Sequence, residues 1–551
     1  MPSTLRTDWL RPALKIKGQD PLGVRAPCEN VYSQLLPGIT NVTDRADLYA
    51  FYPWLIWAFE RHDGKLKKRP FFETLRRAEC LQTLVGIWHT WHTGEDLWRH
   101  GGGLVGRDRL GPAFDQLEQG KTLKLSTFAT MEDGNKNRYF KNKLGGLGQY
   151  YLGSLTDLGI VDGNAIEIKY VTERGGILAA AFDQRINRKR FFDTLEQDRI
   201  GIEDLKPLRR FCPCYLNSVK SQHGTLTELF FNYGRFHDDS MNQRANTLQL
   251  ILDLMSQVDP RDKPPNRTDV EIFRACVYTG ALPSGQVWTT DSVLDRVRAG
   301  WQTYQRNELL SIAVQGIFWA GLSELFRHGY LPVSSEGYRE WFLRTFNGDR
   351  LNIHTEEAVS KTIERTKETR PAMEAWHDSA HEVQIGWQLA DISNSFNPAS
   401  READVIAAAL NVALLLASRI NAAESSYIGF VQHRNYLANY PINLDSFAYH
   451  VRHSWERLSI AELLGWLATD WGISAHLRVA LRKLRYESRD TFKIKPTERG
   501  LEVVDAPAPT FSNPRLVQAN RILRDLGALE LTAEGLVITE CGKNLLEAFQ
   551  H

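Results

Sequence analysis

The sequence predicts a mainly α-helical protein of several domains, with a large helical middle and two or three small modules that mix helix and strand. Apolar residues recur every three or four positions through most of 186–445, while the alternation typical of strands is scarce there. A chain of 551 residues has the length of roughly three or four domains. Its content of 42% apolar and 24% charged residues is that of ordinary globular proteins.

The overall charge excludes a protein that binds acidic partners through its net field. Lys and Arg together number 67, against 66 for Asp and Glu. Any charged partner must therefore be met by a local patch.

The cysteines and the apolar runs favour a cytoplasmic protein without a cofactor or a membrane partner. Of six cysteines only Cys212 and Cys214 are close in sequence, whereas a structural zinc site needs two such pairs, or Cys with His, so a zinc ribbon is not expected. The N-terminus lacks the apolar core of a signal peptide. The most apolar run, 405–418, is shorter than the ~20 residues that cross a bilayer and predicts a buried helix.

The N-terminal part, 1–130, mixes aromatic-rich and helical segments and predicts an α-rich domain. Within it, residues 35–57 (LLPGITNVTDRADLYAFYPWLIW) resemble uncharacterised bacterial proteins, some from anti-phage defence neighbourhoods. This resemblance implies a part in a bacterial genome-maintenance or anti-phage defence system.

An internal repeat relates residues 150–182 to residues 518–549. The two stretches superimpose with one gap, and the shared residues are Leu155 with Leu523, Asp157-Leu158-Gly159 with Asp525-Leu526-Gly527, Thr172-Glu173 with Thr539-Glu540, Gly175 with Gly542, and Ala181-Phe182 with Ala548-Phe549. A shared spacing of turn and core residues predicts that both copies adopt one small fold.

Each part of the repeat has a physical role. Gly159 can end a helix in the left-handed conformation. Two strands, 159–161 and 165–171, are expected to meet at a tight turn at Asp162-Gly163. Thr172 then caps a last helix, 173–182. Helix, hairpin and capped helix resemble the closing half of the winged helix-turn-helix superfamily, which implies modules at 131–185 and 506–551 around a helical domain at 186–445.

A third candidate module lies at 446–505. Residues 459–504 predict a helix, a turn at Trp471-Gly472, a second helix from Ser474 to about Tyr486, and a hairpin with strands at 491–495 and 501–504. The proline-rich segment 505–513 separates it from the last copy.

The second helix of this module is basic. Residues 478–499 hold eight basic and three acidic residues; Arg478, Arg482 and Arg485 share one helical face, and Leu477, Leu481 and Leu484 are expected to anchor another. A recognition helix needs that arrangement. The predicted nucleic-acid contacts are Arg478, Arg482, Lys483, Arg485, Lys493 and Lys495, with a weaker patch at Lys141 and Lys143. Solvated charges and docking of a protein remain the alternatives.

Two residue pairs raise an enzymatic alternative. Glu167 and Lys169 lie two residues apart on a predicted strand. Metal-dependent nucleases present a metal-binding carboxylate and a lysine in this way. The second copy has Glu534 and Leu536 at these places, so the repeat does not need the lysine, and the wing is favoured. His377 and His381, four apart, would chelate a metal if they shared a helix face, although a polar surface is the favoured interpretation.

A further histidine group, His89, His92 and His100, lies beside Trp88, Trp91 and Trp98. Tryptophans at helical spacing usually mark core packing, so core packing is favoured over a metal site here.

The sequence therefore favours a non-catalytic protein that binds DNA or supports a DNA-handling complex together with other subunits. A metal-dependent nuclease or hydrolase is the enzymatic alternative. A subunit that docks only to protein is the third.

Overall fold

The computed structural model describes residues 14–15, 20–163, 168–420 and 440–549. It is 63% helix and 6% strand, which confirms the mainly α class. In chain order the described α-helices are α1 (Ala26–Leu35), α2 (Leu48–Glu60), α3 (Phe71–Thr93), α4 (Arg107–Glu118), α5 (Leu125–Phe128), α6 (Leu152–Asp157), α7 (Glu173–Asp183), α8 (Arg188–Gln197), α9 (Ile202–Leu205), α10 (Lys220–Phe230), α11 (Asn242–Gln257), α12 (Asp269–Thr279), α13 (Ser292–His328), α14 (Ser335–Thr345), α15 (Gly348–Leu351), α16 (Val359–Thr369), α17 (Glu382–Ala390), α18 (Ile392–Ser395), α19 (Arg401–Ser418), α21 (Leu444–His453), α22 (Ile460–Trp466), α23 (Ala475–Glu487), α24 (Leu516–Asp525) and α25 (Glu540–Phe549).

The strands of the described residues form five two-stranded sheets. Four pairs are antiparallel and β1 with β6 is parallel. The pairs are β1 (Leu14–Lys15) with β6 (Arg489–Asp490), β2 (Leu123–Lys124) with β5 (Arg199–Ile200), β3 (Val161–Gly163) with β4 (Ile168–Val171), β7 (Ile494–Thr497) with β8 (Gly500–Val503), and β9 (Leu529–Thr532) with β10 (Gly535–Ile538).

The chain divides into two compact units, each drawn from separate stretches of sequence. Unit 1 comprises 1–32, 274–289 and 299–512, and unit 2 comprises 33–273, 290–298 and 513–551. The finer division into five domains stays a prediction.

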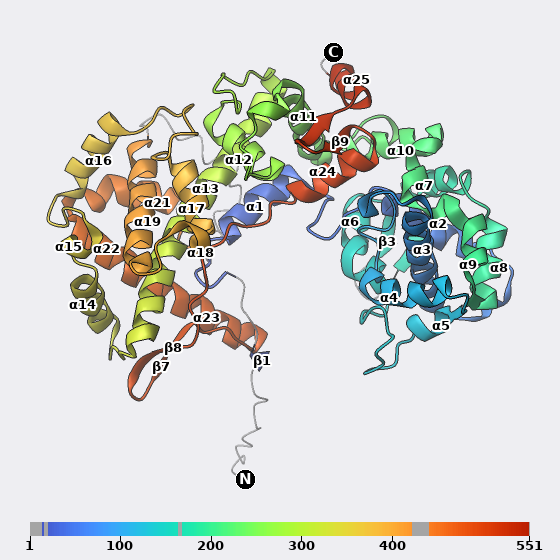
Figure 1. The fold of residues 1–551 in the computed structure, drawn as a ribbon, viewed down its shortest axis with the longest axis horizontal. Coiled ribbons are helices and arrows are strands. Elements are labelled where there is room, and N and C mark those ends of the chain that lie inside the picture. Colours follow the sequence, from blue (N-terminus) through green and yellow to red (C-terminus); the bar gives the residue numbers. More distant parts are fainter. Residues whose placement is uncertain (1–13, 16–19, 164–167, 421–439, 550–551) are drawn as a thin grey trace, which may run out of the picture. The chain divides into compact units, whose positions relative to one another are not determined.

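The core of unit 2 is built around α2, which packs along α7. The Trp54 ring of α2 lies 5.2, 5.3 and 5.5 Å from the ring centroids of Phe182, Phe191 and Phe211. Aromatic rings at these distances stabilise the fold by more than the burial of their surface area alone. The aromatic-rich N-terminal segment thus provides the centre of this unit (Figure 1).

The two copies of the repeat have the same local structure, and both lie in unit 2. Thr172 caps α7 by accepting from Gly175 N at 3.2 Å, and Thr539 accepts from Gly542 N at 3.1 Å. Each threonine hydroxyl also donates to the carbonyl of the helix-ending glycine, Gly159 or Gly527, at 2.6 Å. Both glycines have positive φ, 63° and 73°. The predicted order of helix, hairpin and capped helix is confirmed for both copies.

The first hairpin differs from the prediction at its turn. Asp162 and Gly163 belong to β3, where they pair with Tyr170 and Ile168 of β4. The connection between these strands falls at 164–167, outside the described residues.

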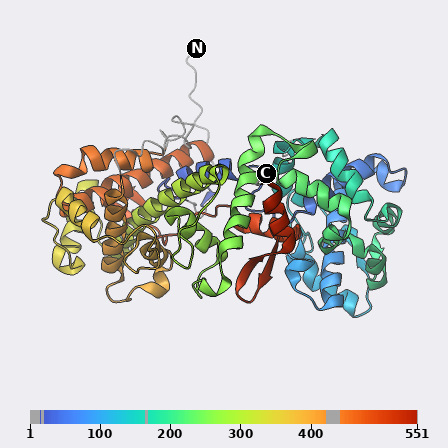
Figure 2. The same ribbon diagram turned by 90° about the horizontal axis from the view of Figure 1, so that it is seen from above.

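The second copy packs on α11 in unit 2. β10, α24 and α25 all contact α11. The Phe231 and Phe549 rings stack with centroids 5.4 Å apart, which holds the end of α25 (Figure 2, dark red).

Unit 1 is a helical assembly in which α16 and α17 both pack on α19. A Cβ at Gly316 of α13 would lie 3.4 Å from the side chains of Val405 and Ala409, so α13 also packs closely on α19. Among the described helices, α13 alone is long and apolar enough to cross a membrane, but 89% of its most apolar 18-residue window is buried. Residues 405–418 form part of α19 and are mostly buried, as predicted, with Asn411 exposed.

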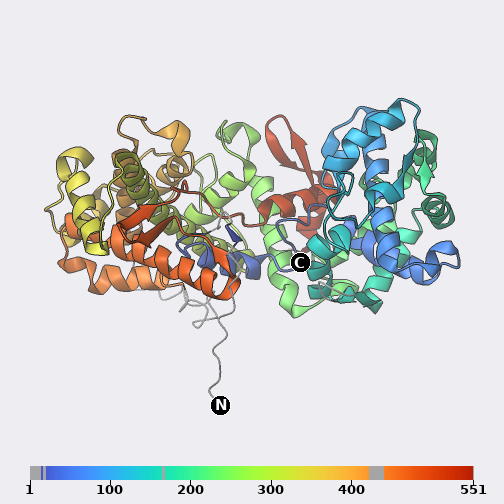
Figure 3. The same ribbon diagram turned by 90° about the horizontal axis from the view of Figure 1, so that it is seen from below.

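The predicted turn at Trp471-Gly472 is wrong. Residues 460–487 form one uninterrupted helical run, in which a π-helical stretch, η11 (Leu467–Ser474), joins α22 to α23 (Figure 3). Trp471 is buried against the rings of Trp466 and Trp455, at 4.9 and 6.2 Å. The free energy gained by burying the Trp471 side chain outweighs the cost of about 1 kcal/mol for a glycine inside a helix.

Candidate nucleic-acid interface and a cysteine–histidine cluster

The C-terminal half of α23 is exposed, with basic and apolar side chains mixed on it. Arg478 and Arg485 are exposed. Tyr486 is 73% and Leu481 56% exposed. The expectation that Leu481 and Leu484 anchor the helix is therefore wrong. The helix is instead held by buried residues of its first turns, namely Ala475, His476, Val479 and Ala480.

Two of the predicted contact residues on α23 are engaged within unit 1. The Arg482 guanidinium lies over the Tyr440 ring, 4.8 Å from its centroid. Lys483 donates to the Asp20 carbonyl at 3.2 Å. Arg478 and Arg485 are the exposed arginines of α23. Arg489, just beyond the helix, is also exposed and lies 3.1 Å from the Glu487 carboxylate.

The predicted wing residue Lys493 does not face solvent. Its side chain is buried and its Nζ lies 2.6 Å from Asp505, so its assignment to nucleic-acid contact is corrected to an internal ion pair. Lys495, on β7, is half-buried and stays a candidate.

The weaker patch, Lys141 and Lys143, lies on an exposed loop of unit 2. Lys143 Nζ stands 4.5 Å from the centroid of the Phe72 ring. Arg76 fixes this loop by donating to the carbonyls of Phe140 and Asn142. Contacts within unit 2 thus hold the backbone of this patch in place.

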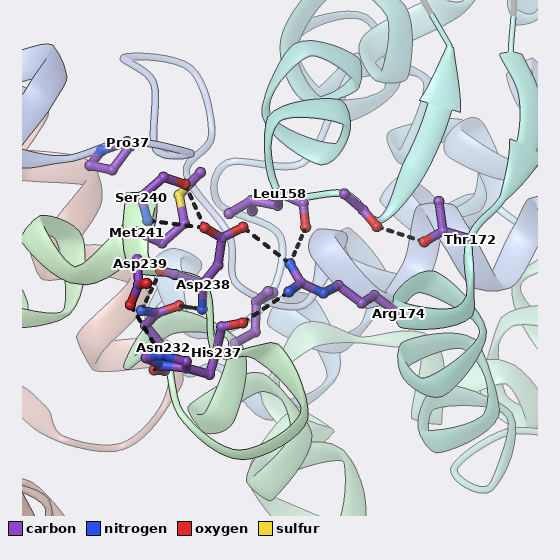
Figure 4. A network of polar contacts seen from close by, with 12 residues as sticks. Pro37, Leu158, Thr172, Arg174, Asn232, His237, Asp238, Asp239, Ser240 and Met241 are labelled. Carbon is purple, nitrogen blue, oxygen red and sulfur yellow. Dashed lines mark hydrogen bonds and ion pairs between the residues drawn. The ribbon is translucent and has the colours of Figure 1, made fainter.

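The first repeat copy uses its own arginine to dock on the loop 232–241 of unit 2 (Figure 4). Arg174 donates to the carbonyls of Leu158 and His237 at 3.4 and 3.0 Å, and lies 3.6 Å from the Asp238 carboxylate. Hydrogen bonds from Ser240, and Arg174 itself, lower the pKa of Asp238. In the second copy Cys541 stands at this place and contacts the equivalent carbonyl, that of Leu526.

The structure tests one of the two enzymatic alternatives and leaves the other outside the described side chains. Glu167 lies outside the described residues, and only the backbone of Lys169 is described. His377 and His381 do not share a helix face, because the turns before α17 carry them apart. His377 bonds the Pro283 carbonyl at 2.6 Å, and His381 caps α17 by accepting from Val383 N. Their interpretation as a metal pair is therefore wrong. The favoured interpretation, a polar surface, holds for the exposed His377 but is wrong for His381, which is fully buried.

The structure brings together four side chains that the sequence leaves far apart. The ligand atoms of His89, His100, Cys212 and Cys214 all lie within 4.8 Å of one another, the one such group among the described residues. His92 is not part of it and stacks on Trp88 at 5.0 Å. The available signals were the Cys212-Pro213-Cys214 pair and two of the three histidines, but nothing in their spacing joins segments more than a hundred residues apart.

Comparisons of the chain with family models, with curated proteins and with solved structures return no match.

Proposed function

We propose that this protein is a non-catalytic DNA-binding protein that contacts DNA through the exposed side chains of α23. The observation that carries the proposal is the pair of solvent-facing guanidinium groups, Arg478 and Arg485, on a helix whose first turns are anchored in unit 1. A helix that is anchored by buried residues and presents arginines to solvent can enter a major groove or lie along the phosphates.

The chemistry of this surface sets what binding would look like. Guanidinium groups pair with phosphate oxygens, so affinity falls steeply as salt rises. Tyr486, 73% exposed, adds a ring on which an unpaired base can stack. Lys495 extends the basic surface beyond the helix, whereas Arg489 is paired with Glu487 at 3.1 Å.

The test is a gel-shift series with the full chain and duplex DNA at low salt. Exchange of both Arg478 and Arg485 for Glu is expected to weaken binding about tenfold or more and to flatten its salt dependence. The matched control carries Arg109→Glu and Arg344→Glu, which place the same charge change at exposed positions elsewhere. Equal affinity of the two double variants would overturn the assignment.

The exposed apolar residues of α23 favour a second candidate, docking to a protein subunit. Leu481 and Leu484 are 56% and 37% exposed beside Tyr486, and such apolar patches mark interaction surfaces. This candidate predicts that the unaltered chain has no affinity for DNA or RNA even at low salt.

A further inference from the structure

We propose that unit 2 contains a structural zinc centre held by His89, His100, Cys212 and Cys214. The two histidines face the two cysteines in pairs, each through Nδ1. His89 Nδ1 lies 3.3 Å from Cys214 Sγ, and His100 Nδ1 lies 3.4 Å from Cys212 Sγ.

The distances fit a tetrahedral ion. Zinc binds sulfur at ~2.3 Å and histidine nitrogen at ~2.0–2.1 Å, so a nitrogen and a sulfur on one tetrahedron stand about 3.5 Å apart. The two measured pairs match this edge. Two separate hydrogen bonds would explain each pair alone, but not why all four ligand atoms converge within 4.8 Å.

The backbone is shaped to bring the histidines together. His89 is in the last turns of α3, and His100 follows the short helix η2 (Leu97–Arg99). A Cβ at Gly101 would lie 3.2 Å from the backbone of Gly86, which is tighter than an ordinary contact, so glycine favours the close approach of this loop to α3. The ring centroids of His89 and His100 are consequently 4.3 Å apart.

Arg45 holds the loop that carries His100. Its Nη1 donates to the carbonyls of Trp98 and Gly102 at 2.9 Å each. The same guanidinium pairs with Asp525 of the second repeat copy at 2.9 Å. Arg45 therefore fixes the backbone before and after His100, with no ion needed for this.

The outer nitrogen of His100 has the partners expected of a metal ligand. His100 Nε2 lies 2.8 Å from the Glu95 carboxylate and 3.2 Å from the Thr93 hydroxyl. A carboxylate on the far nitrogen fixes the tautomer that leaves Nδ1 free to bind, an arrangement common at zinc sites.

The donor set selects the ion and its role. Two thiolates and two imidazoles suit zinc, and four protein ligands leave no open position for substrate, so the centre is structural. Three of the four residues are buried, whereas Cys214 is partly exposed on a cavity of about 550 Å³ in the same unit. This cavity offers the ion a route in. The ion would tie α3 to the segment 212–214, across more than a hundred residues of chain.

The test uses the full chain purified without chelator. Elemental analysis is expected to find about one zinc per chain, and replacement by cobalt is expected to produce the visible absorption of a tetrahedral site with thiolate-to-cobalt charge transfer. Chain that carries no zinc, and that neither takes up zinc nor develops these cobalt bands, would overturn the proposal.

Variants assign the ligands. Cys212→Ser and Cys214→Ser are each expected to lose zinc and to lower the thermal midpoint. His92→Gln and Cys541→Ser remove a histidine and a cysteine that are outside the cluster, and both are expected to keep the full zinc content. Zinc retained by both cysteine variants would contradict the assignment. The cobalt spectrum of the unaltered chain decides the matter even if these variants fail to fold.

Discussion

Gly175 and Gly542 occupy equivalent places where two backbones touch. A Cβ at Gly175 would lie 2.2 Å from the Ile160 carbonyl oxygen, and a Cβ at Gly542 the same distance from that of Ala528. The capped helix of each copy can approach its hairpin only because no side chain intervenes. This explains why the two copies share glycine here, although the residues immediately before and after it differ.

Gly175→Ala is therefore expected to destabilise the protein by about 1–3 kcal/mol, because the added methyl group must push a backbone aside. Gly176 lies next to it in the same helix, and a Cβ there would meet no atom of the described residues within 4 Å. Gly176→Ala should be neutral or stabilising by up to about 1 kcal/mol, since alanine is the better helix former. Unfolding midpoints in denaturant compare the two variants, and equal effects would contradict the close contact.

At the scale of elements, one imidazole joins three segments of unit 1. His476 of α23 is fully buried; its Nδ1 lies 2.9 Å from the Pro21 carbonyl, and its Nε2 accepts from Lys493 N at 2.8 Å. These contacts require a neutral ring with one donor and one acceptor. Burial lowers the pKa of His476 to about 4, with Lys493 and Lys483 adding to the effect.

The free energy of unfolding should consequently depend on pH through this residue. The unfolded ring binds a proton below its usual pKa of ~6.5, whereas the folded ring does so only near 4. The stabilisation is present above pH ~6.5 and falls by roughly 3 kcal/mol as the pH drops to 4. His476→Gln keeps a donor and an acceptor but cannot titrate. Denaturation at a series of pH values should show a weaker pH dependence for this variant, and an unchanged dependence would refute the assignment.

In the run from α22 to α23, prediction of each element from its own residues gave the wrong boundary. Helical periodicity predicted both halves, and glycine beside tryptophan predicted a turn between them, but burial of Trp471 and Ile473 carries the helix straight through. The apolar face of α23 was also mispredicted, because the prediction used local residues alone. Periodicity places Leu481 and Leu484 on an apolar face, but it does not say whether any other element covers that face.

Across the whole molecule, local patterns predicted well what local physics decides. The helical class, the caps at Thr172 and Thr539, and the helix-ending glycines follow from neighbouring residues. The cysteine–histidine cluster does not, because His89 and Cys214 meet only when α3 and the segment after η4 (Lys206–Phe211) pack in unit 2. Likewise the burial of Lys493 depends on Asp505, which the sequence places in a linker.

Deletion of residues 513–551 is expected to loosen unit 2 selectively. These residues supply the Asp525 partner of Arg45, and the Leu526 carbonyl that bonds His223 at 2.9 Å. Hydrogen–deuterium exchange should quicken in α10 and α11, which lose packing partners, and stay unchanged in α17 and α19 of unit 1. Uniform quickening across both units would contradict this expectation.

The composition of the two units also constrains the order in which the chain folds during synthesis. Unit 1 begins with residues 1–32 and is complete only when residue 512 has been made, while unit 2 still lacks 513–551 at that moment. While residues 299–512 emerge from the ribosome, both units are therefore waiting for their closing segments. Neither unit can complete its folding before residue 512 has been made. Two incompletely folded cores therefore coexist in the nascent chain during that interval.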